Sequence, residues 1–176
     1  MPMHVPNPDA TVALTAAGVT LLVDIGDGGL PAIVHWGREL AGLDGPGAAA
    51  LIRASEPVAG TNNIDPVPRL TVLPEHRTGW TGRPGLRGSS AGAGWSPAFT
   101  TTGVRLDGTP VSGFVSAGAG VLEVTAADDD RLELRLEIEL LPSGLLRGRA
   151  AVTNAGDEEY QVEDLVLAFP VPAEEP

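Results

Sequence analysis

The sequence predicts an all-β protein, an antiparallel β-sandwich with at most one short helix. Short runs rich in β-branched residues recur along the chain with glycine-, proline- and asparagine-containing turns between them, and at least seven can be counted. Residues 131–154 alternate apolar and charged side chains strictly enough to specify a hairpin. No long segment shows a strong helical period. These three observations together favour stacked antiparallel sheets over a helical or mixed fold.

The first elements are short. Residues 11–15 and 19–25 are separated by Ala16-Ala17-Gly18, which is typical of a hairpin turn. A glycine-rich turn then precedes a third strand over residues 31–36. Residues 46–55 are rich in alanine and predict one or two turns of helix.

The clearest element is the hairpin of residues 131–154. Apolar side chains occupy the even positions from 132 to 140, and charged side chains occupy the odd ones. Pro142-Ser143-Gly144 supplies a three-residue turn with glycine where a positive φ is needed. Folding the chain about Ser143 pairs Glu139 with Arg147, Glu137 with Arg149, Leu140 with Leu146 and Leu134 with Val152. Because the charged face and the apolar face agree on this register, it is well specified. Residues 161–169 predict one more strand.

Residues 62–99 break the pattern. They are rich in glycine, proline and arginine and show no sustained period of either strand or helix. A connection of nearly forty residues is usually functional or disordered, and Trp80 and Trp95 argue against disorder. Two interpretations remain open from composition alone. The tryptophans pin a long loop onto the sandwich, or their flat faces, with nearby arginines and carboxylates, bind a sugar.

Length and composition set limits on function. The chain has 176 residues, the size of one domain and shorter than the roughly 200–250 residues of a (β/α)8 barrel. Its net charge of −12 argues against nucleic-acid binding, and the absence of cysteine excludes disulfides and thiolate chemistry. The charge is uneven: residues 121–176 carry a net −10, whereas residues 66–106 carry a net +4. The basic, tryptophan-bearing middle is therefore the expected contact surface.

The sequence offers no recognisable catalytic or metal-binding motif. There is no nucleophile elbow, phosphate-binding loop or zinc-binding His-Glu-x-x-His sequence. His35 is expected to be a hydrogen-bonded residue of the core or its rim, and residues 128–130 (Asp-Asp-Asp) a solvated turn rather than a calcium loop. We therefore expect no catalytic residue, no metal and no cofactor. The first residues lack the basic and apolar regions of a signal peptide, and we expect a cytoplasmic protein.

Several segments resemble a known family. Residues 70–76 (Leu-Thr-Val-Leu-Pro-Glu-His), the pair Gly79-Trp80, residues 82–88 (Gly-Arg-Pro-Gly-Leu-Arg-Gly) and residues 95–99 (Trp-Ser-Pro-Ala-Phe) follow one another as in the N-terminal domain of bacterial α-galactosidases (melibiases) of glycoside hydrolase family 36. Further similar segments are residues 141–145, 153–156 and 165–172. The resemblance spans about residues 60–172, and its Leu-Pro-Glu…Gly-Arg-Pro-Gly-Leu-Arg-Gly block is fairly specific.

The resemblance implies a fold and a role. It implies a β-supersandwich of the galactose-mutarotase-like type over residues 1–172, with residues 173–176 beginning a linker to a catalytic (β/α)8 barrel that this sequence lacks. In the family that barrel carries an aspartate nucleophile and an aspartate acid/base and retains the anomeric configuration. The chain would then be a non-catalytic fragment of an enzyme that hydrolyses terminal α-linked galactosides, and we expect no hydrolysis by the isolated chain.

The resemblance also implies a site and partners. Family members often form tetramers in which a loop of this domain reaches the active-site mouth of a neighbouring subunit. Here that loop is residues 65–99, with Asp65, Trp80, Arg83, Arg87 and Trp95 as substrate-binding candidates. The implied partners are α-galactosides, the barrel and further copies of the chain. Two alternatives stay open: a stand-alone carbohydrate-binding module that uses Trp80 and Trp95, and a purely structural assembly domain.

Overall fold

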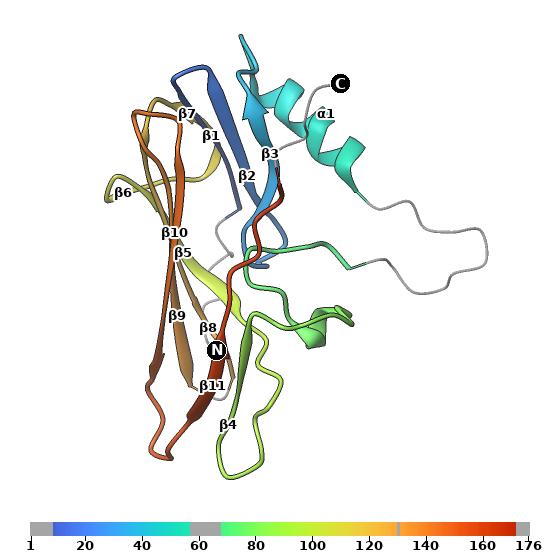
Figure 1. The fold of residues 1–176 in the computed structure, drawn as a ribbon, viewed down its shortest axis with the longest axis vertical. Coiled ribbons are helices and arrows are strands. Elements are labelled where there is room, and N and C mark those ends of the chain that lie inside the picture. Colours follow the sequence, from blue (N-terminus) through green and yellow to red (C-terminus); the bar gives the residue numbers. More distant parts are fainter. Residues whose placement is uncertain (1–8, 57–67, 130, 172–176) are drawn as a thin grey trace, which may run out of the picture.

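The computed structural model describes residues 9–56, 68–129 and 131–171, and within them it confirms the all-β sandwich (Figure 1). The strands are β1 (Ala10–Ala16), β2 (Val19–Ile25), β3 (Ala32–Arg38), β4 (Leu86–Ser89), β5 (Thr100–Leu106), β6 (Thr109–Pro110), β7 (Gly113–Ala117), β8 (Gly120–Ala127), β9 (Leu132–Leu140), β10 (Leu146–Asn154) and β11 (Gln161–Leu165). The helical elements are α1 (Gly45–Ser55) and a short 3-10 turn, η1 (His76–Thr78). No helix in the described ranges is long and apolar enough to cross a membrane.

The first sheet has the strand order β3-β2-β1-β7. The predicted hairpin of β1 and β2 is confirmed, and its two-residue turn places Ala17 and Gly18 at positive φ. Strand β7 joins the sheet parallel to β1. Helix α1 lies on the outer face of this sheet, where Ala48 packs with Ala13 and Leu22 (Figure 1).

Helix α1 is longer than the one or two turns predicted, since it runs for 11 residues. Its start is well specified because the Asp44 side chain accepts the N–H of Gly47 at 2.8 Å and a proline occupies the first turn. Packing of its apolar side against the sheet then extends it beyond what propensity alone predicts.

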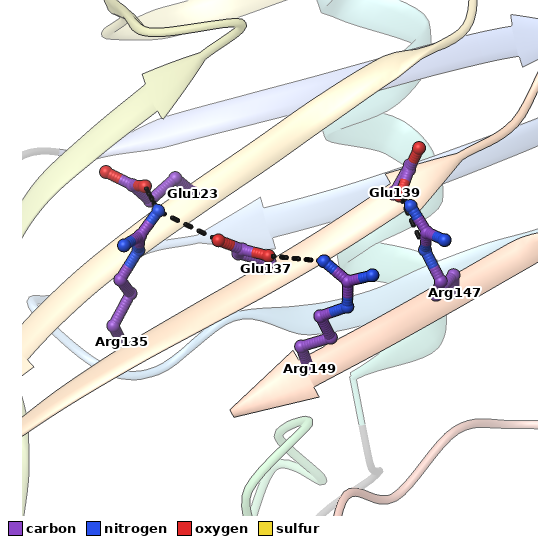
Figure 2. Close-up of polar contacts among 6 residues, drawn as sticks. All are labelled: Glu123, Arg135, Glu137, Glu139, Arg147 and Arg149. Carbon is purple, nitrogen blue, oxygen red and sulfur yellow. Dashed lines mark hydrogen bonds and ion pairs between the residues drawn. The ribbon is translucent and has the colours of Figure 1, made fainter. Parts of the chain in front are cut away.

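The second sheet has the order β10-β9-β8-β5-β6. The predicted β9–β10 register is confirmed at every named pair, including Glu139 with Arg147 and Leu134 with Val152. The charged side chains of β8, β9 and β10 form a ladder of ion pairs on the outer face of the sheet (Figure 2). Glu137 is shared by Arg135 on its own strand and Arg149 on β10.

The main core lies between the inner faces of the two sheets. Alternate residues of β9 are at most 2% exposed, and they meet buried side chains of β1 and β2 such as Leu14 and Leu21. One edge of this core is closed by irregular chain rather than by a strand. Phe169 and Leu167 pack there against the backbone of Gly148, where a β-carbon would lie 2.2 Å from the Phe169 Cζ atom.

The long segment 62–99 departs from the irregular loop that its sequence predicts. Its described part contains η1 and β4, and β4 pairs antiparallel with β11 to form a separate two-stranded sheet. Strand β11 in turn ends at Leu165, short of the predicted residue 169. Beyond it, the N–H groups of Val166 and Ala168 still donate to the carbonyls of Gly85 and Val72. The strand in the loop was missed because its partner lies more than seventy residues away in sequence.

Candidate functional site

The candidate site lies on the part of the molecule that we call the ribbon: residues 76–99 together with β11. Strands β4 and β11 pair from Leu86–Leu165 to Ser89–Gln161, with an irregularity between Val162 and Asp164. The ribbon packs against the main core through Leu86 and Phe99, and the turn after β4 lies at the lower end of the molecule, beside the loop between β10 and β11 (Figure 1). Beyond β4, Ala91 and Gly92 form a tight turn at positive φ, after which the chain returns through Trp95.

The two arginines predicted to bind sugar hydroxyls are both held by acids of β11. The Arg83 guanidinium donates through Nε and Nη2 to the Asp164 carboxylate, with the Nε contact at 3.0 Å. Arg87 Nη2 donates to Glu163 Oε2 at 2.8 Å. The charges of Arg83 and Arg87 are therefore balanced inside the domain by residues about eighty positions later. The sequence places those acids in the strand predicted over residues 161–169 but does not indicate their partners, because only the fold brings them across from the arginines.

The two tryptophans differ in their surroundings. The Trp80 indole N–H donates to the carbonyl of Arg83 at 3.0 Å, and its ring lies against Gly82, where a β-carbon would come within 2.7 Å of Cζ2. Trp80 thus closes its own turn. Trp95 instead leaves 65% of its surface exposed.

Trp95 borders a shallow hollow of about 290 Å³. The residues around it are His76, Pro84, Arg87, Gly88, Ser89, Gly92 and Glu163. The hollow therefore combines an aromatic face with a paired guanidinium and carboxylate, which are the groups that stack on a sugar ring and bind its hydroxyls. His76 Nε2 lies 3.0 Å from the carbonyl oxygen of Gly82.

The structure also reveals a buried acid at the base of the ribbon. Glu75 is 4% exposed, and its Oε1 accepts the N–H of Phe99 at 2.6 Å. Burial raises the pKa of this carboxyl from about 4.5 to about 7, with a smaller contribution from the negative charge of Asp128; the Phe99 hydrogen bond acts in the opposite direction. The sequence analysis identified Glu75 only as part of the motif at residues 70–76 and did not predict its burial. Its place directly after an apolar run was the available signal of burial.

In the part of the chain that the structure describes, the other residues that the sequence analysis singled out do not take part in the hollow beside Trp95. Asp65 falls outside the described residues. His35 is hydrogen-bonded through Nε2 to the Arg38 carbonyl at 3.0 Å, in keeping with its predicted structural role. Asp128 caps the turn before β9 by accepting the N–H of Leu132 at 2.7 Å. Among the described residues, no group of three or more histidines and acids is placed to hold a metal ion.

Comparison with known proteins gives consistent matches. The family model described as the glycosyl hydrolase family 36 N-terminal domain matches residues 29–176. An α-galactosidase of Escherichia coli is 30% identical over 140 residues, which are 79% of this chain and 18% of that protein.

Solved structures of Geobacillus stearothermophilus enzymes share the fold. The family 36 α-galactosidase AgaA in complex with stachyose superposes with a TM-score of 0.64 at 18% identity, over 89% of this chain and 24% of that one. Its complex with raffinose gives 0.63 at 19% identity, over 88% and 24%. The α-galactosidase AgaB gives 0.62 at 17% identity, over 88% and 23%. The chain thus spans about a fifth to a quarter of the length of these relatives.

Proposed function

Because the chain belongs to the glycosyl hydrolase family 36 N-terminal domain family, we propose that it serves as the non-catalytic β-sandwich domain of an α-galactosidase that hydrolyses terminal α-linked galactosides. One observation carries the proposal: 79% of this chain aligns with only 18% of the Escherichia coli α-galactosidase. Most of that enzyme therefore has no counterpart here. Catalysis would come from a barrel domain outside this sequence.

Within such an enzyme, the sandwich would support the barrel and residues 65–99 would contribute to the substrate site or to a contact between subunits. Three features of the ribbon support this role. Its turn lies at one end of the molecule, it presents Trp95 to solvent, and it is stiffened by the two arginine–acid pairs between residues 83–87 and β11. Trp80 and Arg83 would hold the ribbon in shape, while Trp95 and Arg87 would meet the partner or the sugar. The partners would be α-galactosides bound at the barrel and further copies of the enzyme, as in a tetramer.

A second function is favoured by the hollow beside Trp95. A stand-alone carbohydrate-binding module needs an aromatic platform and a few fixed polar groups, and Trp95, Arg87 and Glu163 supply both within one chain. Trp80 fits this role less well, because its indole N–H is already used inside its own turn.

Calorimetric titration separates these two functions. Galactose, melibiose, raffinose and stachyose are titrated in turn into the 176-residue chain, and hydrolysis of a nitrophenyl α-galactoside is followed in parallel. Absence of heat with no hydrolysis supports the accessory domain. Binding at millimolar or tighter Kd that is lost in Trp95→Ala and kept in Trp80→Ala supports the module. Sustained hydrolysis by the isolated chain would overturn both.

A further inference from the structure

Glu75 ties the two ends of the ribbon loop together. Its carboxylate reaches across 24 positions of sequence to the backbone N–H of Phe99. Both residues are buried, at 4% and 5% exposure. The backbone of Glu75 is fixed as well: its carbonyl oxygen accepts hydrogen bonds from the N–H and the hydroxyl of Thr78, at 3.2 and 2.8 Å. The hydrogen bond between Glu75 and Phe99 therefore closes a loop of residues 76–98, and this loop contains Trp95.

Glu75 is also a neighbour of the exposed tryptophan. Glu75 and Trp95 line one small pocket, together with Leu73, Pro74, His76, Pro84, Leu86, Ser96 and Pro97. Its volume is about 10 Å³, which is at most the space of a single water molecule. Because close-packed groups cannot shift independently, a change in the Glu75–Phe99 contact must be accommodated by the segment 95–99.

The charge of this carboxyl changes near neutral pH. Burial raises the pKa of Glu75 to about 7, and the negative charge of Asp128 on the turn after β8 adds to that rise. Of the described residues that line the small pocket, only His76 is titratable besides Glu75 itself. An ionised carboxylate accepts a hydrogen bond roughly twice as strong as a neutral acid does. The hydrogen bond to Phe99 is therefore stronger above about pH 7 than below it.

We propose that Glu75 is the positioning residue of the ribbon, and that its protonation state sets how firmly Phe99 is held and, through the segment 95–99, where Trp95 lies. Ionisation strengthens the hydrogen bond to Phe99 but places an unfavourable charge in a buried site, so the packing of the segment 95–99 differs between the two forms. The functional consequence of this placement, a pH-dependent contact with sugar or partner, rests on the function proposed above. The coupling of Glu75 to Trp95 does not.

The coupling is tested by nuclear magnetic resonance on the ¹⁵N-labelled 176-residue chain, titrated from about pH 5.5 to about pH 8.5. The Phe99 backbone amide and the Trp95 indole N–H are the two reporters. We expect both signals to shift with one shared midpoint near pH 7. Glu75→Gln keeps the size and an acceptor oxygen but removes the titration, so both curves should become flat.

Two further variants serve as controls. His76→Gln removes the neighbouring imidazole and should leave both curves in place. Asp128→Asn keeps the acceptor for Leu132 but removes the negative charge, and it should lower the shared midpoint.

Three results would overturn the proposal: a flat Phe99 curve in the parent chain, a Phe99 curve that the Trp95 indole does not follow, or curves that survive Glu75→Gln. If Glu75→Gln does not fold, the parent chain and Asp128→Asn decide the matter by themselves. None of these results would contradict the proposed role as the accessory domain of an α-galactosidase. A chain that binds no sugar would likewise leave the coupling intact.

Discussion

Glu75 carries a buried carboxyl whose raised pKa makes the stability of this domain depend on pH. Its folded-state pKa of about 7 lies above the ordinary value of about 4.5, so the native state binds this proton more tightly than the unfolded chain does. Its contribution to stability is therefore fully present below about pH 4.5. It is lost as the pH rises through about 7.

We predict that Glu75→Gln removes this loss. The shift corresponds to roughly 3 kcal/mol of unfavourable free energy at alkaline pH, at about 1.4 kcal/mol for each pKa unit. The difference in free energy of unfolding, variant minus parent, should thus be larger at about pH 8 than at about pH 5 by up to that amount, so the variant gains stability relative to the parent as the pH rises. Any fixed cost of the buried amide cancels in this difference. Urea denaturation at the two pH values measures it, and an equal effect at both would contradict the assignment.

At the scale of elements, the ribbon depends on a close approach between β4 and its neighbours. A β-carbon at Gly88 would lie 2.5 Å from the carbonyl oxygen of Gln161 and 2.6 Å from Cε1 of Tyr160. Only glycine allows the two strands and the tyrosine ring to come this near.

We predict that Gly88→Ala destabilises the chain by about 1–3 kcal/mol and exposes the ribbon to protease. The matched control is Gly118→Ala, where the nearest atom would be 3.9 Å away. That variant should lie within about 0.5 kcal/mol of the parent. Chemical denaturation and limited proteolysis give the two readouts. Equal effects of the two substitutions would show that the ribbon tolerates a wider spacing.

The charged ladder of the second sheet belongs to the same scale (Figure 2). The Glu139–Arg147 pair joins directly opposed residues of β9 and β10, where the Arg147 Nε contact measures 2.7 Å. Because both side chains are partly exposed, solvent weakens their attraction.

A double-mutant cycle with Glu139→Gln and Arg147→Gln should give a coupling of about 0.2–1 kcal/mol that shrinks at about 1 M salt. A coupling that persists unchanged in salt would mean that the pair is effectively desolvated.

For the whole molecule, the proposed role separates the scaffold from the contact surface. Part of the negative charge of residues 121–176 is balanced within the fold, because Asp164 and Glu163 pair with Arg83 and Arg87 of the ribbon. The exposed Trp95 is left as the prominent feature of that end of the molecule.

We predict different effects for the two ribbon tryptophans when the domain is joined to a catalytic barrel. In a chimaera that carries this chain in place of the matching region of the Escherichia coli α-galactosidase, Trp95→Ala should lower kcat/KM for raffinose by roughly 3- to 10-fold, as expected for the loss of one aromatic contact. Most of the loss should be in KM. Trp80→Ala should act through stability, lowering Tm with little change in kcat/KM once the enzyme is folded. Equal kinetic losses in both variants would place both rings at the substrate.

Much of the fold was visible in the sequence because its signals are local. The β9–β10 register follows from alternation and one glycine turn, and the β1–β2 hairpin follows from two β-branched runs around Ala17-Gly18. The family resemblance was visible for the same reason, since its motifs are contiguous. The strand β4 was not visible in the sequence, because residues 86–89 (Leu-Arg-Gly-Ser) form a strand only where β11 lies beside them.

The sequence by itself determined the class of the domain, its two main hairpins and the segment that carries the tryptophans. Only the tertiary structure decided how that segment is used: which tryptophan faces solvent, which acids hold Arg83 and Arg87, and that Glu75 is buried against Phe99. The physical reason is the range of the interactions. Periodicity and turn chemistry act between neighbours in the chain, whereas burial, charge pairing and a raised pKa arise from residues that folding brings together across dozens of positions.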